Sequence, residues 1–244
     1  MAFLMIAEKI MTDVLINQDE TIDECDKLKV IQKADGFRFS LDAVILAEFA
    51  TVKKGDRVID LGAGNGIISL IVASKAEHIT AVEIQPEMVD LAFRNVILND
   101  LSDKIKVVED DLTLAKEHFP SGQFDVVITN PPYRTVGSGR LNPNDLKAIA
   151  RHELKCTLDD VFRVSFHLLK ERGRLAIVHR PDRLIDLIVN CRQHRLEPKR
   201  IQFIHIGKDQ EASLVLVEAV KNGKPDLKVL RPKIIDVGIS NGNR

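Results

Sequence analysis

Hydrophobic residues along the chain form short strand patterns that alternate with longer helical patterns. Short, mostly apolar runs predict strands over Arg57–Leu61, Ile79–Glu83, Ile105–Val108, Asp125–Thr129, Gly173–His179, Lys199–Ile206 and Ser213–Val220. Apolar residues at helical spacing predict helices over Ile67–Ala76, Pro86–Leu98, Leu158–Lys170 and Pro181–Cys191. Because strands that alternate with helices form right-handed crossover units, this order predicts a parallel sheet with helices on both faces.

The last two strand patterns break this alternation. Only the short polar turn 207–212 separates them, which predicts an antiparallel hairpin. The sequence therefore predicts an α/β fold with a doubly wound, mostly parallel sheet of seven strands, closed by this hairpin with one reversed edge strand. The stretch 130–158 has weak periodicity and is longer than most loops of a compact domain, so we expect it either to carry function or to be mobile.

The composition narrows the class of protein. The 244 residues are 45% hydrophobic and 29% charged, which is typical of a globular chain rather than a disordered one. Cys25, Cys156 and Cys191 include no CxxC pair, so we expect no disulfide framework, no metal site and a reducing, cytoplasmic location. The apolar start of the chain has no basic segment before it, and no run approaches the roughly 18 apolar residues of a membrane span. We therefore expect no signal peptide and no membrane contact.

The charge of the chain is unevenly distributed. The formal net charge is −1, but residues 1–129 carry a net −10 and residues 130–244 a net +9. Such an asymmetry indicates contact with nucleic acid or a membrane surface, and random clustering of solvated charges is the alternative explanation.

A glycine-rich turn follows the first predicted strand of the parallel sheet. Asp60 ends that strand, and Gly62, Gly64 and Gly66 follow it with GxGxG spacing. This spacing is neither the GxGxxG of dinucleotide-binding domains nor a phosphate-binding P-loop. Glycines at this place allow a tight turn and the close approach of a ligand outside the carboxyl ends of the strands.

Acidic residues end the next two predicted strands. Glu83 ends the second strand, where a carboxylate can accept hydrogen bonds from two ribose hydroxyls, and Asp110 and Asp111 follow the third. This constellation resembles the S-adenosylmethionine-dependent methyltransferases of the Rossmann-like class I. An NAD-type domain or a turn that only packs remains the alternative.

That resemblance implies roles for each of these residues. The glycine turn with Asp60 would hold the methionine end of the cofactor, Glu83 the ribose, and Asp111 the adenine. Asp110 competes with Asp111 for the adenine, because the run Glu109-Asp110-Asp111 leaves the alignment ambiguous by one residue.

The run Asn130-Pro131-Pro132-Tyr133 follows the fourth predicted strand and contains the only Tyr of the chain. Two prolines cannot continue a central strand, so the chain must leave the sheet there. The Asn130 side chain and the Pro131 carbonyl could accept the N–H bonds of a planar amine and free its lone pair for attack on a methyl group. Tyr133 could stack on a base. A rigid turn with a packed aromatic is the alternative.

This turn resembles those of methyltransferases that act on adenine-N6, cytosine-N4, guanine-N2 or a glutamine amide. It therefore indicates a catalytic role for Asn130, Pro131 and Tyr133, with Asn130 also beside the cofactor, and it does not choose among those substrates.

The stretch Gln32–Ala47 narrows the choice among these amine substrates. Ser40 can cap a helix whose first turn contains Asp42, and a capped amphipathic helix is the simpler interpretation. Together with Asn130–Tyr133 and Ala150–Glu153, however, it resembles the bacterial tRNA(Val) adenine-N6 methyltransferase family over Leu28–Val220. The resemblance implies S-adenosylmethionine as cofactor, with Phe39, Ser40 and Asp42 over it, and an anticodon-loop adenine of tRNA as substrate.

The resemblance also implies that the basic half of the chain, residues 130–244, binds RNA. Arg134, Arg140 and Arg151 would bind RNA phosphates around Tyr133, and several of the other basic residues of this half, which include Arg180, Arg183, Arg192 and Arg195, would surround the same mouth. We expect a monomer with an N-terminal extension, 1–35, that packs on the cofactor side, a methyltransferase domain, 36–220, and a polar tail, 221–244.

Three alternatives remain open at this stage. One is methylation of guanine-N2 in ribosomal RNA, but no internal duplication of the kind common in those enzymes is seen. Another is methylation of a release-factor glutamine, but the N-terminal stretch is too short for the helical domain of those enzymes. The last is a non-catalytic RNA-binding module, against which Glu83, Asn130 and Tyr133 argue.

Overall fold

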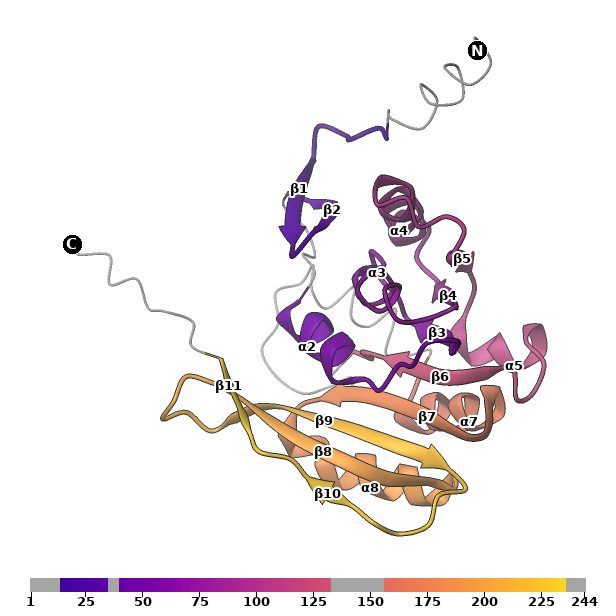
Figure 1. The fold of residues 1–244 in the computed structure, drawn as a ribbon, viewed down its shortest axis with the longest axis vertical. Coiled ribbons are helices and arrows are strands. Elements are labelled where there is room, and N and C mark those ends of the chain that lie inside the picture. Colours follow the sequence, from indigo (N-terminus) through magenta and orange to yellow (C-terminus); the bar gives the residue numbers. More distant parts are fainter. Residues whose placement is uncertain (1–13, 35–39, 133–155, 236–244) are drawn as a thin grey trace.

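The computed structural model describes residues 14–34, 40–132 and 156–235. Within these ranges nine strands form the main sheet: β3 (Arg57–Leu61), β4 (His78–Glu83), β5 (Ile105–Glu109), β6 (Phe124–Thr129), β7 (Leu169–His179), β8 (Leu196–Ile206), β9 (Ala212–Lys221), β10 (Lys228–Val229) and β11 (Lys233–Ile235). Their order is β10-β8-β9-β7-β6-β3-β4-β5, with β11 also paired to β8 (Figure 1). The predicted doubly wound, mostly parallel sheet is confirmed.

Helices cover both faces of this sheet. One face carries α2 (Leu41–Phe49), α3 (Ile67–Val72) and α4 (Pro86–Leu98), and the other carries η1 (Leu112–Leu114), α5 (Ala115–His118), α7 (Leu158–Leu168), η2 (Pro181–Arg183) and α8 (Leu184–Gln193). Neighbouring strand residues point into different cores: Val58 packs with the α2 and α3 side, whereas Ile59 packs with the α7 and α8 side. Because both faces of the central strands are buried, they read as continuous apolar runs in the sequence.

Local signals in the sequence set the helix starts. Ser40 caps α2 by accepting a hydrogen bond from the Ala43 amide, as predicted, and Asp42 lies in the first turn. Pro86 opens α4 at the position where a missing N–H costs nothing. Thr157 and Asp160 form a capping box at the start of α7.

The C-terminal hairpin exists, but its reversed strand is not at the edge. β9 lies between β7 and β8 and is antiparallel to both, so the predicted edge position is wrong. The reason is burial: the centre of β9 is buried continuously, as an interior strand requires, whereas β8 is buried only at intervals. Within the expected polar tail, β10 and β11 then add to the outer side of β8.

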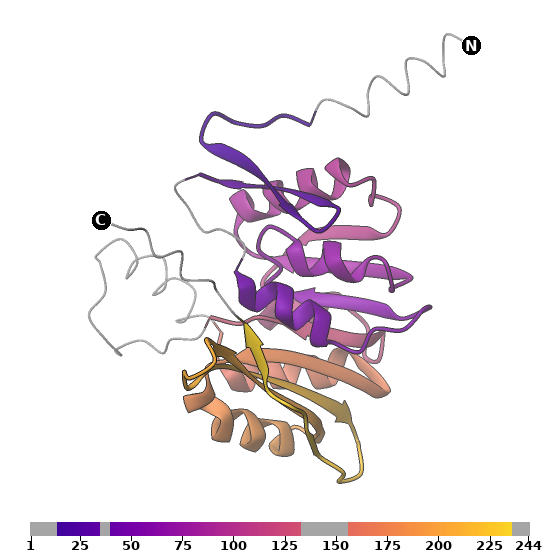
Figure 2. The same cartoon turned by 60° about the vertical axis from the view of Figure 1, so that its left-hand side comes forward.

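A second, separate sheet lies near the start of the chain. β1 (Glu20–Cys25) and β2 (Leu28–Lys33) form an antiparallel hairpin whose turn contains Asp26 with a φ of +52°. Figures 1 and 2 show this hairpin beside α4, at the β5 end of the main sheet. Across the described ranges, we find no helix with the length and apolarity that a membrane crossing requires.

Candidate functional site

Four parallel strands bring their carboxyl ends to one edge of the sheet. β3 pairs in parallel with both β4 and β6, and β4 pairs with β5, so the segments that follow these strands are neighbours. The Thr129 hydroxyl at the end of β6 donates a hydrogen bond of 2.9 Å to the Leu61 carbonyl at the end of β3. This bond holds the start of the Asn130-Pro131 turn against the start of the glycine turn, which the sequence predicted to lie together.

The glycine turn has a backbone that only glycine adopts easily. Gly62, Gly64 and Gly66 have φ values of +75°, +56° and +85°, in the left-handed region. The amides of Gly62 and Ala63 both donate to the Val82 carbonyl at 2.9 Å, which ties the turn to β4. Among the described residues, a Cβ at Gly62 or Gly64 would meet no atom within 4 Å, so this part of the turn is open within the described structure. That space is where a ligand can approach the bare backbone.

Glu83 is bound to this turn directly. Its carboxylate is 5% exposed, and it accepts hydrogen bonds of 2.9 Å from the amides of Gly64, Ile84 and Gln85. A carboxylate has about four acceptor positions, so this arrangement fixes its orientation and leaves capacity for a further donor. Glu83 is therefore both a clamp on the glycine turn and an acceptor at the open edge.

Asp60 lies below the turn in a fully buried position. Its Oδ2 atom accepts a hydrogen bond of 2.8 Å from the Ser69 hydroxyl on α3, and among the described residues its Oδ1 atom has no partner. Burial raises the pKa of the Asp60 carboxyl to about 7, and the nearby charge of Glu83 adds to the shift. A cation placed near this carboxyl would favour its ionised form.

The two candidates for the adenine end are already engaged locally. Asp111 caps η1, because its Oδ1 atom accepts hydrogen bonds from the Thr113 amide at 2.9 Å and the Thr113 hydroxyl at 2.7 Å. Asp110 lies 2.6 Å from the His118 Nδ1 atom, and this contact raises the pKa of His118. The Asp110 amide also donates to the Glu83 carbonyl, so both residues lie at the same edge as Glu83.

The proposed catalytic turn lies only partly in the described residues. Asn130 is half-buried and Pro131 is buried directly after β6. His179 ends the neighbouring strand β7 and is 1% exposed. Burial lowers the pKa of His179 to about 4, and its Nδ1 atom accepts a hydrogen bond of 2.8 Å from the Arg180 amide, so the ring is neutral at pH 7.

Other predicted site residues lie outside the described ranges, namely Phe39, Tyr133, Arg134, Arg140 and Arg151. Among the described residues, no group of three His, Cys, Asp or Glu is placed to hold a metal ion. Sequence reasoning missed Ser69, Asn65 and Asn95. Asn95 and Asn99 did give a signal, because an apolar helix that repeats Asn at i and i+4 presents two amides on one face.

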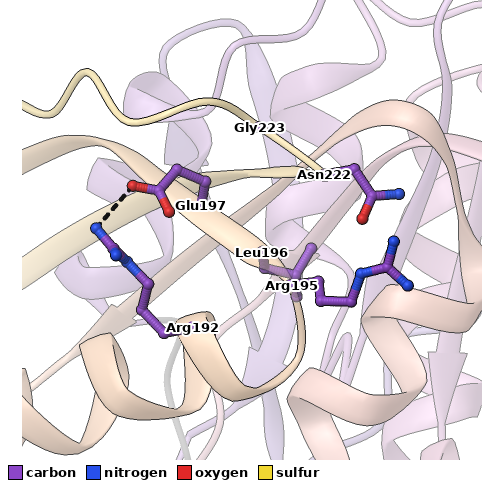
Figure 3. Close-up of a pocket in the computed structure, with 6 residues that line it drawn as sticks. All are labelled: Arg192, Arg195, Leu196, Glu197, Asn222 and Gly223. Atoms are coloured by element: carbon purple, nitrogen blue, oxygen red, sulfur yellow. Dashed lines mark hydrogen bonds and ion pairs between the residues drawn. The ribbon is translucent and has the colours of Figure 1, made fainter.

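The basic residues divide between the two edges of the sheet. Arg180 and Arg183 follow β7 and therefore lie at the carboxyl edge, as predicted. Arg192 and Arg195 precede β8, which runs in the same direction as β7, so they lie at the opposite edge and are not among the basic residues that can surround the mouth. There they line a hollow of about 330 Å³ with Glu197, which pairs with Arg192 at 2.9 Å (Figure 3).

Comparison with known proteins agrees with this geometry. A family model described as "Methyltransferase small domain" matches residues 40–186. The tRNA1(Val) (adenine(37)-N6)-methyltransferase of Phocaeicola vulgatus is 30% identical over 72% of this chain and 74% of its own length. The protein of the same name from Aliivibrio salmonicida is 24% identical over 75% of this chain and 77% of its own length.

Solved structures share the fold. A predicted O-methyltransferase from Agrobacterium tumefaciens has a TM-score of 0.63 and 28% identity, covering 80% of this chain and 87% of its own. TYW2 of P. horikoshii, solved in complex with MeSAdo, has a TM-score of 0.58 and 16% identity, covering 85% of this chain and 73% of its own.

Proposed function

Because the chain belongs to the methyltransferase small-domain family, among relatives named tRNA1(Val) (adenine(37)-N6)-methyltransferase, we propose that it methylates the exocyclic N6 of an adenine in tRNA. S-adenosylmethionine would be the methyl donor and an anticodon-loop adenine of tRNA(Val) the acceptor. Such a base is unpaired, so placing it in a pocket costs little. A tRNA substrate fits a cytoplasmic location.

The observation that carries this proposal is the place of the Asn130-Pro131 turn. The Thr129–Leu61 hydrogen bond holds its start beside the glycine turn, at the edge where a methyl donor would lie. The Asn130 side-chain oxygen and the Pro131 carbonyl are acceptors for the two N–H bonds of an adenine amino group. Holding the nitrogen in this way frees its lone pair and aligns it for attack, and orientation of this kind contributes several kcal/mol.

The residues of the edge fit the cofactor. The open space at Gly62 and Gly64 admits a ligand against the backbone, and the acceptors of Glu83 face the same edge. When bound, the sulfonium of S-adenosylmethionine would supply an electrophilic methyl group. Asp60 would provide negative charge near the methionine end, Glu83 would accept from the ribose, and Asp111 or Asp110 would meet the adenine.

The residues outside the described ranges complete the proposal. Phe39, together with Ser40 and Asp42, would lie over the cofactor, and Tyr133 would stack on the target base. Arg134, Arg140 and Arg151 would bind RNA phosphates, which position a substrate without reading its sequence.

Replacement of Asn130 by Ala tests the mechanism. We expect methyl transfer to tRNA to fall by about 100-fold or more, because the target nitrogen is no longer oriented, while calorimetry still detects cofactor binding. The matched control is Asn190→Ala, since Asn190 lies on α8 and its amide donates only to the Asp186 carbonyl. Equal turnover in the Asn130 variant and the parent would exclude this mechanism.

The product identifies the substrate. Total tRNA, ribosomal RNA and a purified release factor are incubated separately with labelled cofactor, and the RNA is then digested to nucleosides. Labelled N6-methyladenosine from tRNA is the expected result. Labelled N2-methylguanosine, a labelled release factor, or cofactor binding without transfer to any substrate would each favour one of the alternative functions.

A further inference from the structure

Asn95 connects the glycine turn to strand β2 of the N-terminal hairpin. It lies in the middle of α4 and is 0% exposed. Its Oδ1 atom accepts a hydrogen bond of 2.6 Å from the Ile31 amide, and its Nδ2 atom donates at 3.0 Å to the carbonyls of Ile31 and Asn65. One side chain therefore holds both backbone groups of a β2 residue and a carbonyl of the glycine turn.

The bond to Asn65 holds the turn from the side of α4. Asn65 lies between Gly64 and Gly66, and its side-chain Nδ2 atom is buried with no partner among the described residues. Glu83 and the Val82 carbonyl hold the amides on the β4 side of the turn. At Gly62 and Gly64 a Cβ would meet no atom of the described residues within 4 Å, so hydrogen bonds rather than packing hold this part of the turn.

Helix α4 also touches the turn directly. A Cβ placed on Gly66 would lie 3.3 Å from the Ala92 Cβ atom, which is one helical turn before Asn95. The face of α4 that carries Ala92 and Asn95 is therefore the surface on which the glycine turn rests. Substitution of Asn95 would therefore also weaken the packing of Gly66 against Ala92 on the same face of α4.

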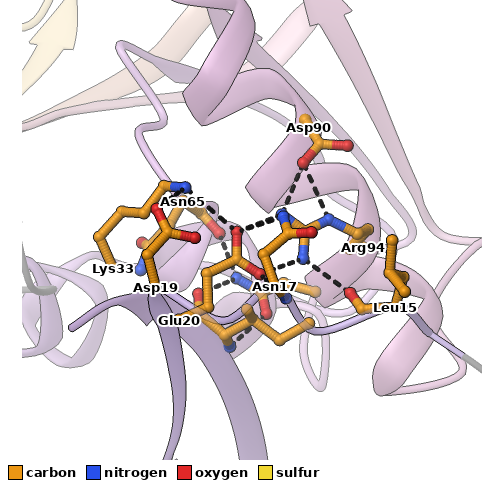
Figure 4. A network of polar contacts seen from close by, with 10 residues as sticks. Leu15, Asn17, Asp19, Glu20, Lys33, Asn65, Asp90 and Arg94 are labelled. Carbon is orange, nitrogen blue, oxygen red and sulfur yellow. Dashed lines mark hydrogen bonds and ion pairs between the residues drawn. The ribbon is translucent and has the colours of Figure 1, made fainter.

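The same helix anchors the N-terminal hairpin at a second and a third point. Asn99 accepts from the Lys29 amide at 3.0 Å and donates to the Lys29 carbonyl at 2.7 Å, but it does not touch the turn. Arg94 forms two hydrogen bonds, of 2.7 and 2.8 Å, with the carboxylate of Glu20 on β1, and Figure 4 shows this network with Asn65 beside it. Asn99 thus shares the docking role of Asn95 and lacks its contact with the turn.

We propose that Asn95 is a positioning residue that sets the shape of the glycine turn for the cofactor and couples that turn to the β1–β2 hairpin. The inference rests on the proposed function for the identity of the cofactor. The coupling itself is a property of Asn95, Asn65 and Ile31. Through it, displacement of the hairpin would change cofactor affinity without any contact between the hairpin and the cofactor.

The test compares Asn95→Ala with Asn99→Ala in the full chain. Both variants lose the amide pair that docks β2, but only the first leaves the Asn65 carbonyl unpaired. We expect the dissociation constant for S-adenosylmethionine, measured by calorimetry, to rise about tenfold or more for Asn95→Ala and less than about twofold for Asn99→Ala. Hydrogen exchange in residues 62–66 should accelerate only in the Asn95 variant.

The results distinguish a failure of the proposed function from a failure of the positioning role of Asn95. A parent chain that does not bind the cofactor contradicts the proposed function, while exchange in the turn still decides the coupling. Equal losses of affinity in both variants, or no loss in either, would overturn the positioning role and leave Asn95 as a docking residue alone. If Asn95→Ala does not fold, as judged by its thermal transition, Asn95→Ser is compared with Asn99→Ser by the same criteria.

Discussion

Asp60 is the residue whose charge state is most strongly set by the fold. Its pKa of about 7 lies above the ordinary value of 3.8, because desolvation of the fully buried carboxyl outweighs the hydrogen bonds that it accepts from Ser69. The folded state therefore binds a proton that the unfolded state releases between these two values. Stability contributed by the neutral carboxyl is complete below pH 3.8 and is lost as the pH rises toward 7.

Asp60→Asn should remove this pH dependence. Between pH 5 and pH 8 we expect the free energy of unfolding of the parent to fall by about 2–3 kcal/mol relative to the variant, following about 1.4 kcal/mol per pKa unit. Urea unfolding of both chains at the two pH values measures this difference, and pH-independent effects of the substitution cancel. A constant difference between the chains would mean that Asp60 is ionised throughout.

The sequence patterns predicted the position of Asp60 but not its protonation state. The GxGxG spacing after a buried strand predicted the turn of Gly62–Gly66 and the strand-end position of Asp60, and the positive φ values explain why those glycines are needed. Ser69 was not predicted as its partner, because it lies within the apolar run of α3. A tertiary contact between a strand end and a helix leaves no periodic signal in the sequence.

At the scale of elements, a buried ion pair is one of the contacts that hold the β1–β2 hairpin on α4. The Glu20 side chain is 0% exposed, and its two hydrogen bonds with Arg94 hold its pKa well below its usual range. A lowered carboxyl pKa stabilises the fold above the unfolded value, near pH 4.5, and this contribution is lost as the pH falls below it. Asp90, the second partner of Arg94, is 58% exposed.

Glu20→Ala should therefore destabilise the protein much more than Asp90→Ala. Breaking a buried pair costs about 3–5 kcal/mol, and because Arg94 keeps its hydrogen bonds to Asp90 in this variant, we expect a loss at the lower end of that range. An exposed pair contributes less than about 1 kcal/mol. Denaturant unfolding at pH 7 measures both values. Similar small losses would show that Arg94 finds other partners when Glu20 is absent.

The helices and strands were predicted correctly where the residues at their own ends determine where they begin and end. Pro86 and the apolar spacing of α4 gave its bounds correctly, whereas α3 ends at Val72 rather than the predicted Ala76. The hairpin β1–β2 was missed because its turn contains Asp26-Lys27 and no glycine. β8 begins before the predicted Lys199, because a register shift after Pro198 lets the strand accommodate a proline.

At the scale of the whole molecule, basic residues lie at both ends of the sheet strands. Only those at the carboxyl edge can contact a substrate bound beside Glu83 and Asn130. Arg180 and Arg192 are similarly exposed, at 51% and 61% of the side chain, and each has one acidic neighbour. Arg180 lies at the edge that carries Glu83 and Asn130, and Arg192 lies at the other. The sequence showed a basic half, but only the direction of each strand assigned its members to an edge.

Arg180→Ala and Arg192→Ala form a matched pair for this reason. We expect Arg180→Ala to weaken tRNA binding and to reduce the slope of log affinity against log salt by about 0.7–0.9, the value of one lost phosphate contact. Arg192→Ala should leave both quantities unchanged. Filter binding across a salt series measures them, and a larger effect of Arg192→Ala would place the RNA at the opposite edge.

The amides of Asn95 and Asn99 have one more consequence, for association between molecules. They satisfy the outward backbone groups of Ile31 and Lys29, which are alternate residues on the free side of β2. An unpaired strand edge is a template on which another chain can add a strand. The side chains of Asn95 and Asn99 bond the backbone groups of β2 that a third strand would otherwise bond. Another chain therefore cannot easily add a strand at this edge, and the protein resists strand exchange and aggregation at β2.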